Sequence, residues 1–270
     1  MRPMLLCSLL LASTLAIAAD VAPTAAMQAD AAQFLVPVAG NVRGAGGEHF
    51  LTDLTVVNFR GVDQLVKLEW IPAGAPAAVE TTLVVPFLSY LTWSDVVGTQ
   101  LHTEGLGAIL VTAVDASGDP DAAGEIDGYA RIWTAVSCEG IPGTVSQSLA
   151  PMLLGGWRDE SPAYVHGVRH TSEFRTNWGV VNLDRTEARR FQVIVNSGTG
   201  KVERTIELEP FTMLQQPVPL GPYGDLSIYV EPLEPAGRWT AYASSVDNHT
   251  GSGWVVPAVQ PRTDIVFPTQ

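Results

Sequence analysis

The sequence has few cysteines and few charged residues for its length. Only 2 of its 270 residues are cysteine, so the chain cannot be a disulfide-rich scaffold. Charged residues make up 16% of the chain, below the roughly 25% of typical soluble domains. Basic residues are especially scarce, because 15 Lys and Arg stand against 28 Asp and Glu and give a net charge of −13. Phosphate would repel such a chain, which argues against a nucleic-acid partner.

Long apolar runs are also missing, apart from one at the N-terminus. Residues 4–19 are mostly apolar, follow one positive charge and end in small residues, as in a secretory signal peptide. The small-x-small pattern predicts cleavage after Ala18, with Ala19 as the alternative. The run is shorter than the about 20 residues of a transmembrane helix, so no transmembrane segment is expected. We therefore expect a secreted or periplasmic protein with a signal peptide at 1–18 and a flexible leader at 19–33.

Common catalytic signatures are absent from the sequence. It contains no His-Glu-x-x-His helix, no Gly-x-Ser-x-Gly elbow and no Cys-x-x-Cys pair. His166 and His170 are four residues apart, a span of about 13 Å along a strand, which is too far for one metal ion. Cys138 would be the sole cysteine of the exported chain, either buried or paired between chains. We predict no enzyme, and a Ser-His-Asp site assembled from distant segments is the alternative.

The sequence contains a long internal repeat. The segment FLTDLTVVN at 50–58 aligns with FRTNWGVVN at 174–182, which lies 124 residues later. Solenoid repeats are only 20–50 residues long, so a unit of this size indicates a whole domain with its own core. We expect two such domains, at 34–155 and 156–270, with the boundary near the glycine pair at 155–156.

Two further matches support the repeat. Pro86-Phe87 aligns with Pro210-Phe211 at the same offset, and the late segment 129–134 aligns with 240–245. Asn58 and Asn182 end the repeated segment, where an asparagine side chain is expected to cap a turn.

The local pattern within each copy is that of β-strands. Apolar residues alternate with polar ones, which places one face on the core and one in water; examples are Val66, Leu68, Trp70, Phe191, Val193, Val195, Leu226, Ile228 and Val230. The run 107–114 is continuously apolar, as in a central strand covered on both sides. Its 25 glycines and 19 prolines favour frequent turns. The predicted fold is all-β: two tandem β-sandwiches of Ig-like or Greek-key type, each of about seven strands. Outward glutamates at 203–209 would protect an edge strand.

The segments at 174–182 and 242–248 (YASSVDN) carry a resemblance to known proteins. They resemble an uncharacterised family of exported bacterial proteins built of tandem β-sandwich repeats. A weaker likeness connects them to the small β-sandwich of the sensory-rhodopsin transducer family. The resemblance implies a β-sandwich and an extracytoplasmic setting, and it supplies no catalytic residues. The first copy departs from it, with Asp53 in place of Asn and Arg131-Ile-Trp133 in place of small residues.

The loop at 115–127 is the candidate metal site. Five carboxylates lie within these 13 residues: Asp115, Asp119, Asp121, Glu125 and Asp127. Calcium binds to 6–8 oxygens on flexible loops, so this cluster predicts calcium as the one candidate cofactor. The spacing does not match an EF-hand, and the second copy has no equivalent. The alternative is a solvated hairpin between two strands.

Seven tryptophans provide the candidate ligand-binding residues. Trp70 and Trp178 fall in strand patterns and are expected in the core. Trp157 and Trp254 are the best candidates for exposure, together with Trp133 in the late strand. Exposed tryptophans stack on sugar rings or fill protein interfaces.

These features favour a non-catalytic exported module that acts in adhesion, as a scaffold or in envelope structure. Its partner would be a protein or a glycan outside the cytoplasm. The alternative is a carbohydrate-binding protein that uses exposed tryptophans, and the second alternative is a hydrolase with a site at the interdomain cleft. Sandwich folds carry many functions, so the sequence leaves the ligand and the oligomeric state open.

Overall fold

The computed structural model describes residues 32–44, 47–138, 140–154, 157–198, 200–219, 221, 224–234 and 237–261. The expected signal peptide, most of the leader and the expected domain boundary lie outside the described residues. The fold is all-β and antiparallel, as the sequence predicts, with one short helix, α2 (Val96–Thr99), among the described elements. No helix within the described residues is long and apolar enough to span a membrane.

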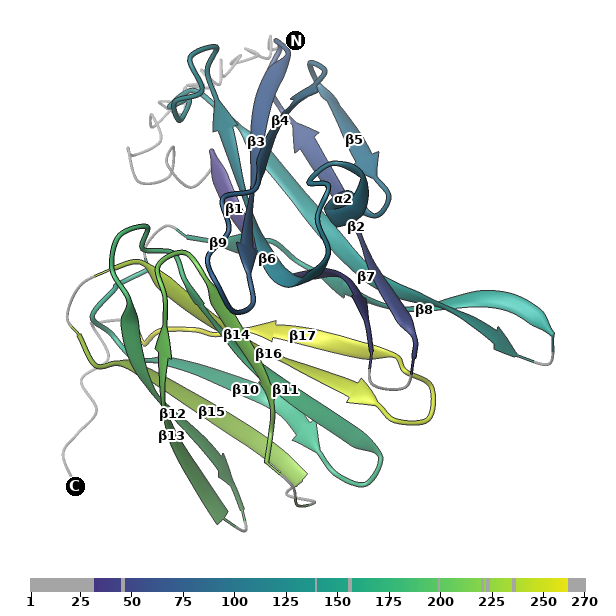
Figure 1. The fold of residues 1–270 in the computed structure, drawn as a ribbon, viewed down its shortest axis with the longest axis vertical. Helices are drawn as coiled ribbons and strands as arrows, with labels where there is room; N and C mark the ends of the chain where they lie inside the picture. Colours follow the sequence, from purple (N-terminus) through teal and green to yellow (C-terminus); the bar gives the residue numbers. More distant parts are fainter. Residues whose placement is uncertain are drawn as a thin grey trace, which may run out of the picture.

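The described residues of the first half form nine strands (Figure 1, upper part). They pair in the order β4-β3-β6-β1-β2-β7-β8, with β5 beside β2 and β9 beside β1. The end of β1 bends across to β2 and joins it through only two residue pairs, Val42 with Phe50 and Arg43 with His49. The strands are β1 (Gln33–Arg43), β2 (His49–Asn58), β3 (Gln64–Pro72), β4 (Glu80–Val85), β5 (Ser89–Trp93), β6 (Gly105–Val114), β7 (Ile126–Cys138), β8 (Ile141–Leu149) and β9 (Met152–Leu153).

The second half forms two four-stranded sheets (Figure 1, lower part). Their orders are β13-β12-β15-β10 and β14-β11-β16-β17. The first half contains the same two orders, β4-β3-β6-β1 and β5-β2-β7-β8, so each strand of the second half has a counterpart in the first. The strands are β10 (Ala163–His170), β11 (Phe174–Asn182), β12 (Arg189–Ser197), β13 (Gly200–Leu208), β14 (Met213–Pro217), β15 (Gly224–Pro232), β16 (Trp239–Asp247) and β17 (Gly253–Pro257).

The strand registers correct the alignment of the late strands. In the first half Thr55 on β2 pairs with Tyr129 on β7, and in the second half its counterpart Gly179 on β11 pairs with Tyr242 on β16. Tyr129 therefore corresponds to Tyr242 and not to Thr240. The expected alignment was wrong by two residues, because such a shift keeps every side chain on the same face of its strand and leaves the pattern unchanged.

A second correction concerns the turn before β5 and β14. Leu88 and Phe211 both have positive φ angles, 45° and 53°. Their N–H groups donate to equivalent carbonyls, those of Arg60 and Asp184. The counterpart of Phe211 is therefore Leu88 and not Phe87, one residue away from the alignment expected from the shared Pro-Phe pair.

Two buried clusters form the interior, one centred in each half. The alternating strand residues are buried as predicted, and Trp70 and Trp178 both lie in the core. The run at 107–114 is buried along its whole length because β6 lies between β3 and β1 and is covered on both faces. The glutamate-rich β13 is an edge strand, also as predicted.

Asn58 and Asn182 cap turns as predicted, and each also bonds to the end of a distant strand. Both side chains are almost fully buried. Each Oδ1 accepts from the N–H two residues later, and each Nδ2 donates to three backbone carbonyls. Two of these carbonyls lie at the end of β4 or β13 or one residue after it, and these strands do not pair with the strand that carries the asparagine. Each asparagine therefore connects the two strand groups of its half, β4-β3-β6-β1 with β5-β2-β7-β8 and β13-β12-β15-β10 with β14-β11-β16-β17.

Candidate binding site at the junction of the two halves

The second half buries one sheet face against the first half. This face, which we call the Tyr242 face, belongs to β11, β14, β16 and the turns beside them; it comprises Val181, Leu183, Phe211, Met213 and Tyr242. Four of these residues are buried and Phe211 is partly buried, and all five pack with the buried cluster of the first half. The first half therefore supplies part of the hydrophobic cover of the second.

Tyr242 lies at the centre of this junction. Its side chain is fully buried, and its hydroxyl donates to Oε1 of Gln215 at 2.8 Å. The ring lies across Gly179, where a Cβ atom would come within 2.3 Å of it. The ring therefore needs glycine at position 179. Burial raises the pKa of the Tyr242 hydroxyl well above its usual value, so it stays a neutral donor.

The first half receives the Tyr242 face on the outer side of β1, β3 and β6. We call this the Leu110 face; it comprises Leu35, Glu69, Ile71 and Leu110, which the registers place on one side of the sheet. All four are buried, although they point away from the core of their own half. An isolated bridge between Ala73 and Met213 joins the halves beside this face.

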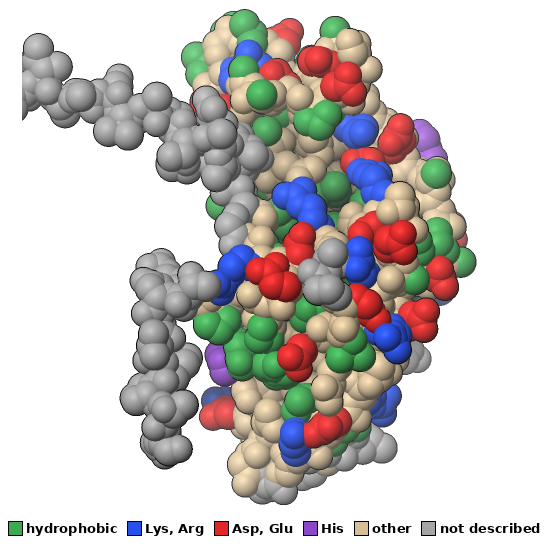
Figure 2. Space-filling view, turned by 90° about the vertical axis from the view of Figure 1, so that its left-hand side faces the viewer, with side chains coloured by type: hydrophobic (Ala, Val, Ile, Leu, Met, Phe, Trp, Pro, Cys, Tyr) green, Lys and Arg blue, Asp and Glu red, His purple; other side chains and the backbone are tan. Residues whose placement is uncertain are grey.

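An ion pair between two described residues crosses the junction. Arg185 donates through Nη2 to both carboxylate oxygens of Glu69, at 2.8 and 2.9 Å. The guanidinium also lies over the ring of Phe211, 4.3 Å from its centroid. Glu69 is almost fully buried, and Arg185 together with Lys67, whose Nζ lies 3.5 Å from Oε1, supplies the charge that its position requires. Figure 2 shows the molecule from the left-hand side of Figure 1. Basic (blue) and acidic (red) side chains alternate across the middle of this view.

Asp184 is the most strongly perturbed carboxylate at the junction. Burial alone would raise its pKa, but hydrogen bonds from Arg189 and from the N–H groups of Thr186 and Glu187 outweigh that effect. Together they hold the pKa well below its usual range. Arg189 lies 2.5 Å away, and both side chains are largely buried.

We expect Asp184→Asn to remove a pH-dependent contribution to stability. A carboxylate with a lowered pKa in the folded state stabilises the fold above its unfolded pKa of about 4, and this contribution is lost as the pH falls below that value. The variant should therefore be about 2 kcal/mol less stable than the wild type at pH 7, with the difference shrinking toward pH 2. Urea unfolding across this range measures it. The matched control is Asp225→Asn, an exposed partner of Arg169, and an equal response of both variants would contradict the explanation.

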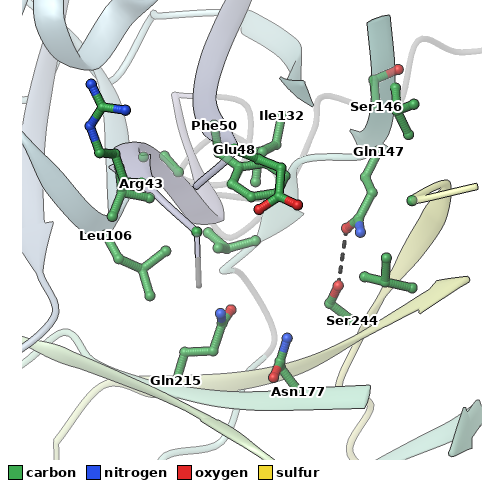
Figure 3. Close-up of a pocket in the computed structure, with 18 of the residues that line it drawn as sticks. Arg43, Glu48, Phe50, Leu106, Ile132, Ser146, Gln147, Asn177, Gln215 and Ser244 are labelled. Atoms are coloured by element: carbon green, nitrogen blue, oxygen red, sulfur yellow. Dashed lines mark hydrogen bonds between the residues drawn. The ribbon is translucent and has the colours of Figure 1, made fainter. Parts of the chain in front are cut away.

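A cleft of about 560 Å³ opens beside the junction. Both halves contribute to it, through β1, β2, β6, β7 and β8 from the first and β11, β14 and β16 from the second. Figure 3 shows Gln215 and Asn177 extending from the second half into the space below Leu106 and Glu48. Its other polar lining residues include Arg43, Ser146, Gln147, Arg175 and Ser244.

The cleft presents mostly amide and hydroxyl groups above an apolar floor. Ser244 donates to Oε1 of Gln147 at 3.0 Å, which connects the two halves across the cleft (Figure 3). Phe50 is the aromatic residue among the described lining. This lining, which also includes the charged side chains of Arg43, Glu48 and Arg175, suits a polar ligand better than an apolar one. The described lining residues include serines and Glu48 but no histidine, so they assemble no Ser-His-Asp site.

The acidic loop connects two strands that do not pair with each other, so it is not a hairpin. β6 pairs with β1 and β3, whereas β7 pairs with β2 and β8, so the expected hairpin between neighbouring strands was wrong. Asp121 forms an ion pair with Arg60 at 2.6 Å. Asp115, Asp121 and Asp127 accept hydrogen bonds from N–H groups of the loop or of the adjoining β7. Asp119 and Glu125 contribute backbone carbonyls, to Asp115 and Phe59. Within the described part of the chain no three His, Cys, Asp or Glu side chains are placed to hold a metal ion, and calcium stays a prediction.

The three candidate tryptophans lie apart from one another. Trp157 is partly buried and packs edge-on against Trp239, 5.4 Å between ring centroids. Trp133 donates to Asp53 at 2.9 Å on the outer side of the first half. Trp254 is 37% exposed and donates to the carbonyl of Gly167. None of the three lines the cleft, so the structure gathers no tryptophan platform there.

The histidine pair lies on a strand, as expected. His166 and His170 are both on β10, with a bulge between them. His166 is exposed, while His170 is partly buried and accepts from the N–H of Thr176. Burial lowers the pKa of His170. Cys138 ends β7, and its side chain lies outside the described residues.

Sequence reasoning missed the cleft and the Tyr242 face. Asn177 and Gln215 look like ordinary outward residues of strands, and Val181, Met213 and Tyr242 look like ordinary core residues. The signal that could have identified them is Gly179 opposite a large aromatic residue, because a glycine inside a strand often marks a close approach. No protein-family model matches the chain, and no curated protein matches it.

Proposed function

We propose that this protein is a non-catalytic module outside the cytoplasm that acts through its surfaces, in adhesion, as a scaffold or in envelope structure. In this proposal residues 34–155 and 156–270 are two tandem sandwich units of Ig-like or Greek-key type, following a signal peptide cleaved after Ala18. The repeated strand order and the shared buried junction support a rigid two-unit body. A partner protein would then meet a surface whose geometry is fixed.

The observation that carries this proposal is an exposed apolar face on the first half. The outer side of β2, β5 and β7 presents Phe59, Leu88, Tyr90 and Tyr129, each at least half exposed. Val57 lies between them and is partly buried. Contiguous apolar surface of this kind marks binding sites for other proteins. Tyrosine is also among the residues enriched in the centres of protein interfaces.

Site-specific photo-cross-linking tests the proposal. A photoreactive residue at position 129, introduced in the cells that produce the protein, should give a discrete protein adduct in the fraction outside the cytoplasm. The same residue at position 141 is the control, because Ile141 is also exposed but lies at the tip of the β7–β8 hairpin. Adducts at neither position, or a protein retained in the cytoplasm, would contradict the proposal.

Carbohydrate binding is the second candidate, and the cleft favours it over the tryptophans. The side-chain amides that line the cleft are suited to sugar hydroxyls. On a glycan array, binding would have to be lost in Asn177→Ala and kept in Trp254→Ala, since Asn177 lines the cleft and Trp254 does not. If the wild-type protein bound no glycan on the array, this candidate function would be excluded.

A further inference from the structure

The exposed apolar face of the first half is the counterpart of the face that the second half buries. We call it the Tyr129 face. Registers and turn hydrogen bonds match the two faces residue by residue: Val57 with Val181, Phe59 with Leu183, Leu88 with Phe211, Tyr90 with Met213, and Tyr129 with Tyr242. The repeat therefore has the same docking face twice, once covered and once open.

The difference in exposure is large. Tyr242 is fully buried, whereas Tyr129 is 53% exposed and Tyr90 is 64% exposed. Thr55 stands where Gly179 stands in the second half, and its hydroxyl lies 2.8 Å from that of Thr92. Tyr129 is thus paired across the strands with a threonine and not with a glycine. The face has kept its apolar residues although no part of the described chain covers it.

The Leu110 face, on which the Tyr242 face packs, is repeated as well. The registers match Leu35, Glu69, Ile71 and Leu110 of the Leu110 face with Tyr164, Ile194, Asn196 and Tyr229 on the outer side of β10, β12 and β15. We call this second set the Tyr229 face. Tyr164 and Tyr229 pack edge-on with ring centroids 5.1 Å apart. Tyr164, Ile194 and Tyr229 are only partly buried, so this face too is open.

The two open faces carry no charge at the position of the internal ion pair, although each has an acidic residue elsewhere, Asp127 beside Val57 and Glu231 two residues from Tyr229. At the internal junction, Glu69 on the Leu110 face pairs with Arg185 from beside the Tyr242 face. The counterpart of Glu69 is Ile194, and the counterpart of Arg185, three residues after its asparagine, is Gly61. Both members of the ion pair are therefore replaced by uncharged residues. A contact between the open faces would bury no unpaired charge at this point.

We propose that the Tyr129 face of one molecule docks on the Tyr229 face of a second copy, which repeats the internal junction between molecules. This inference deepens the proposed function, on which it rests, by identifying the partner as another copy of the chain. Because the two faces differ, the contact is head-to-tail, and each added molecule leaves one face of each kind open. Association then continues beyond the dimer unless the rotation closes a ring.

Sedimentation velocity of the purified exported protein tests the inference. The average mass should rise with concentration and should not stop at the dimer. Tyr129→Asp and Ile194→Asp each place a charge at the centre of one face, and each should raise the dissociation constant by at least roughly 30-fold. Ile141→Asp, on neither face, should associate like the wild type. Circular dichroism confirms that each variant is folded.

Mixing the two face variants distinguishes head-to-tail contact from other modes. Tyr129→Asp retains an intact Tyr229 face and Ile194→Asp retains an intact Tyr129 face, so an equimolar mixture should form a dimer that grows no further. If two Tyr129 faces met each other, Ile194→Asp would associate like the wild type. Mixing it with Tyr129→Asp would then produce no additional association. That result, or a wild type that stays monomeric up to millimolar concentration, would overturn the inference. A monomeric wild type that still cross-links from position 129 to another protein would leave the proposed function standing and remove only this partner.

Discussion

Replacing Asn182 by alanine is expected to lower the free energy of unfolding by about 4 kcal/mol. The side chain is fully buried and makes four hydrogen bonds to backbone groups, one accepted and three donated. Alanine would leave these groups without their partner, and each buried group left unpaired costs about 1–3 kcal/mol. Because Leu208 ends β13 of the opposite sheet and Glu209 follows it directly, the loss also loosens the connection between the sheets. Urea unfolding measures the change.

Asn58→Ala should give a loss of similar size, since Asn58 makes the equivalent bonds in the first half. Asn248→Ala is the control. Asn248 also bonds to a backbone carbonyl and to a side chain, but it is exposed, so water replaces its partners and the cost should stay below about 1 kcal/mol. Equal losses in Asn182→Ala and Asn248→Ala would contradict a structural role for the buried pair.

Tyr242→Ala is expected to cost about 4 kcal/mol, whereas Tyr129→Ala should change stability by less than about 0.5 kcal/mol. The two tyrosines occupy equivalent positions, but only Tyr242 is buried. Truncating a buried aromatic side chain typically costs about 3–5 kcal/mol, because it removes apolar contact and leaves a cavity. Substitutions of exposed residues away from special features stay within about 0.5 kcal/mol. Unfolding at low protein concentration, where molecules are monomeric, measures both.

Tyr242→Phe separates packing from hydrogen bonding at the junction. It keeps the ring over Gly179 and removes only the bond to Gln215, so about 1 kcal/mol should be lost. If Tyr129→Ala were as destabilising as Tyr242→Ala, the Tyr129 face would be part of the fold and not a free surface. If Tyr242→Phe lowered the free energy of unfolding as much as Tyr242→Ala, packing of the ring would not be the main contribution of Tyr242 to stability.

The sequence predicts much of the fold because strand patterning is a local property. Alternation correctly predicts the buried sides of β3, β12 and β15, and the continuous run correctly predicts the covered central strand β6. The role of Asn58 and Asn182 follows from their position at the end of a repeated strand, and their turn bonds confirm it. Each of these features depends on residues that are near neighbours in the chain.

The candidate sites were less predictable because they depend on which surfaces meet. Tyr242 and Tyr129 have the same pattern in the sequence, yet one is buried between the halves and the other is exposed. The choice is made by the packing of the whole second half on the first, which no local pattern encodes. Trp157 shows the same limit, because its place against Trp239 depends on a contact across 82 residues of the chain. The acidic loop was misassigned to a hairpin because a loop sequence does not reveal whether its flanking strands pair.

The chain carries its internal docking contact a second time, as the open Tyr129 and Tyr229 faces. Oxidative footprinting with mass spectrometry tests this, because it reports the accessibility of Tyr129, Tyr229 and Tyr242 in one experiment. At low concentration Tyr129 and Tyr229 should react while Tyr242 stays protected. As the concentration rises, Tyr129 and Tyr229 should lose reactivity over the same range, with Ile141 as the unchanged reference. Protection of Tyr129 without Tyr229, or free reaction of Tyr242 at any concentration, would contradict the account.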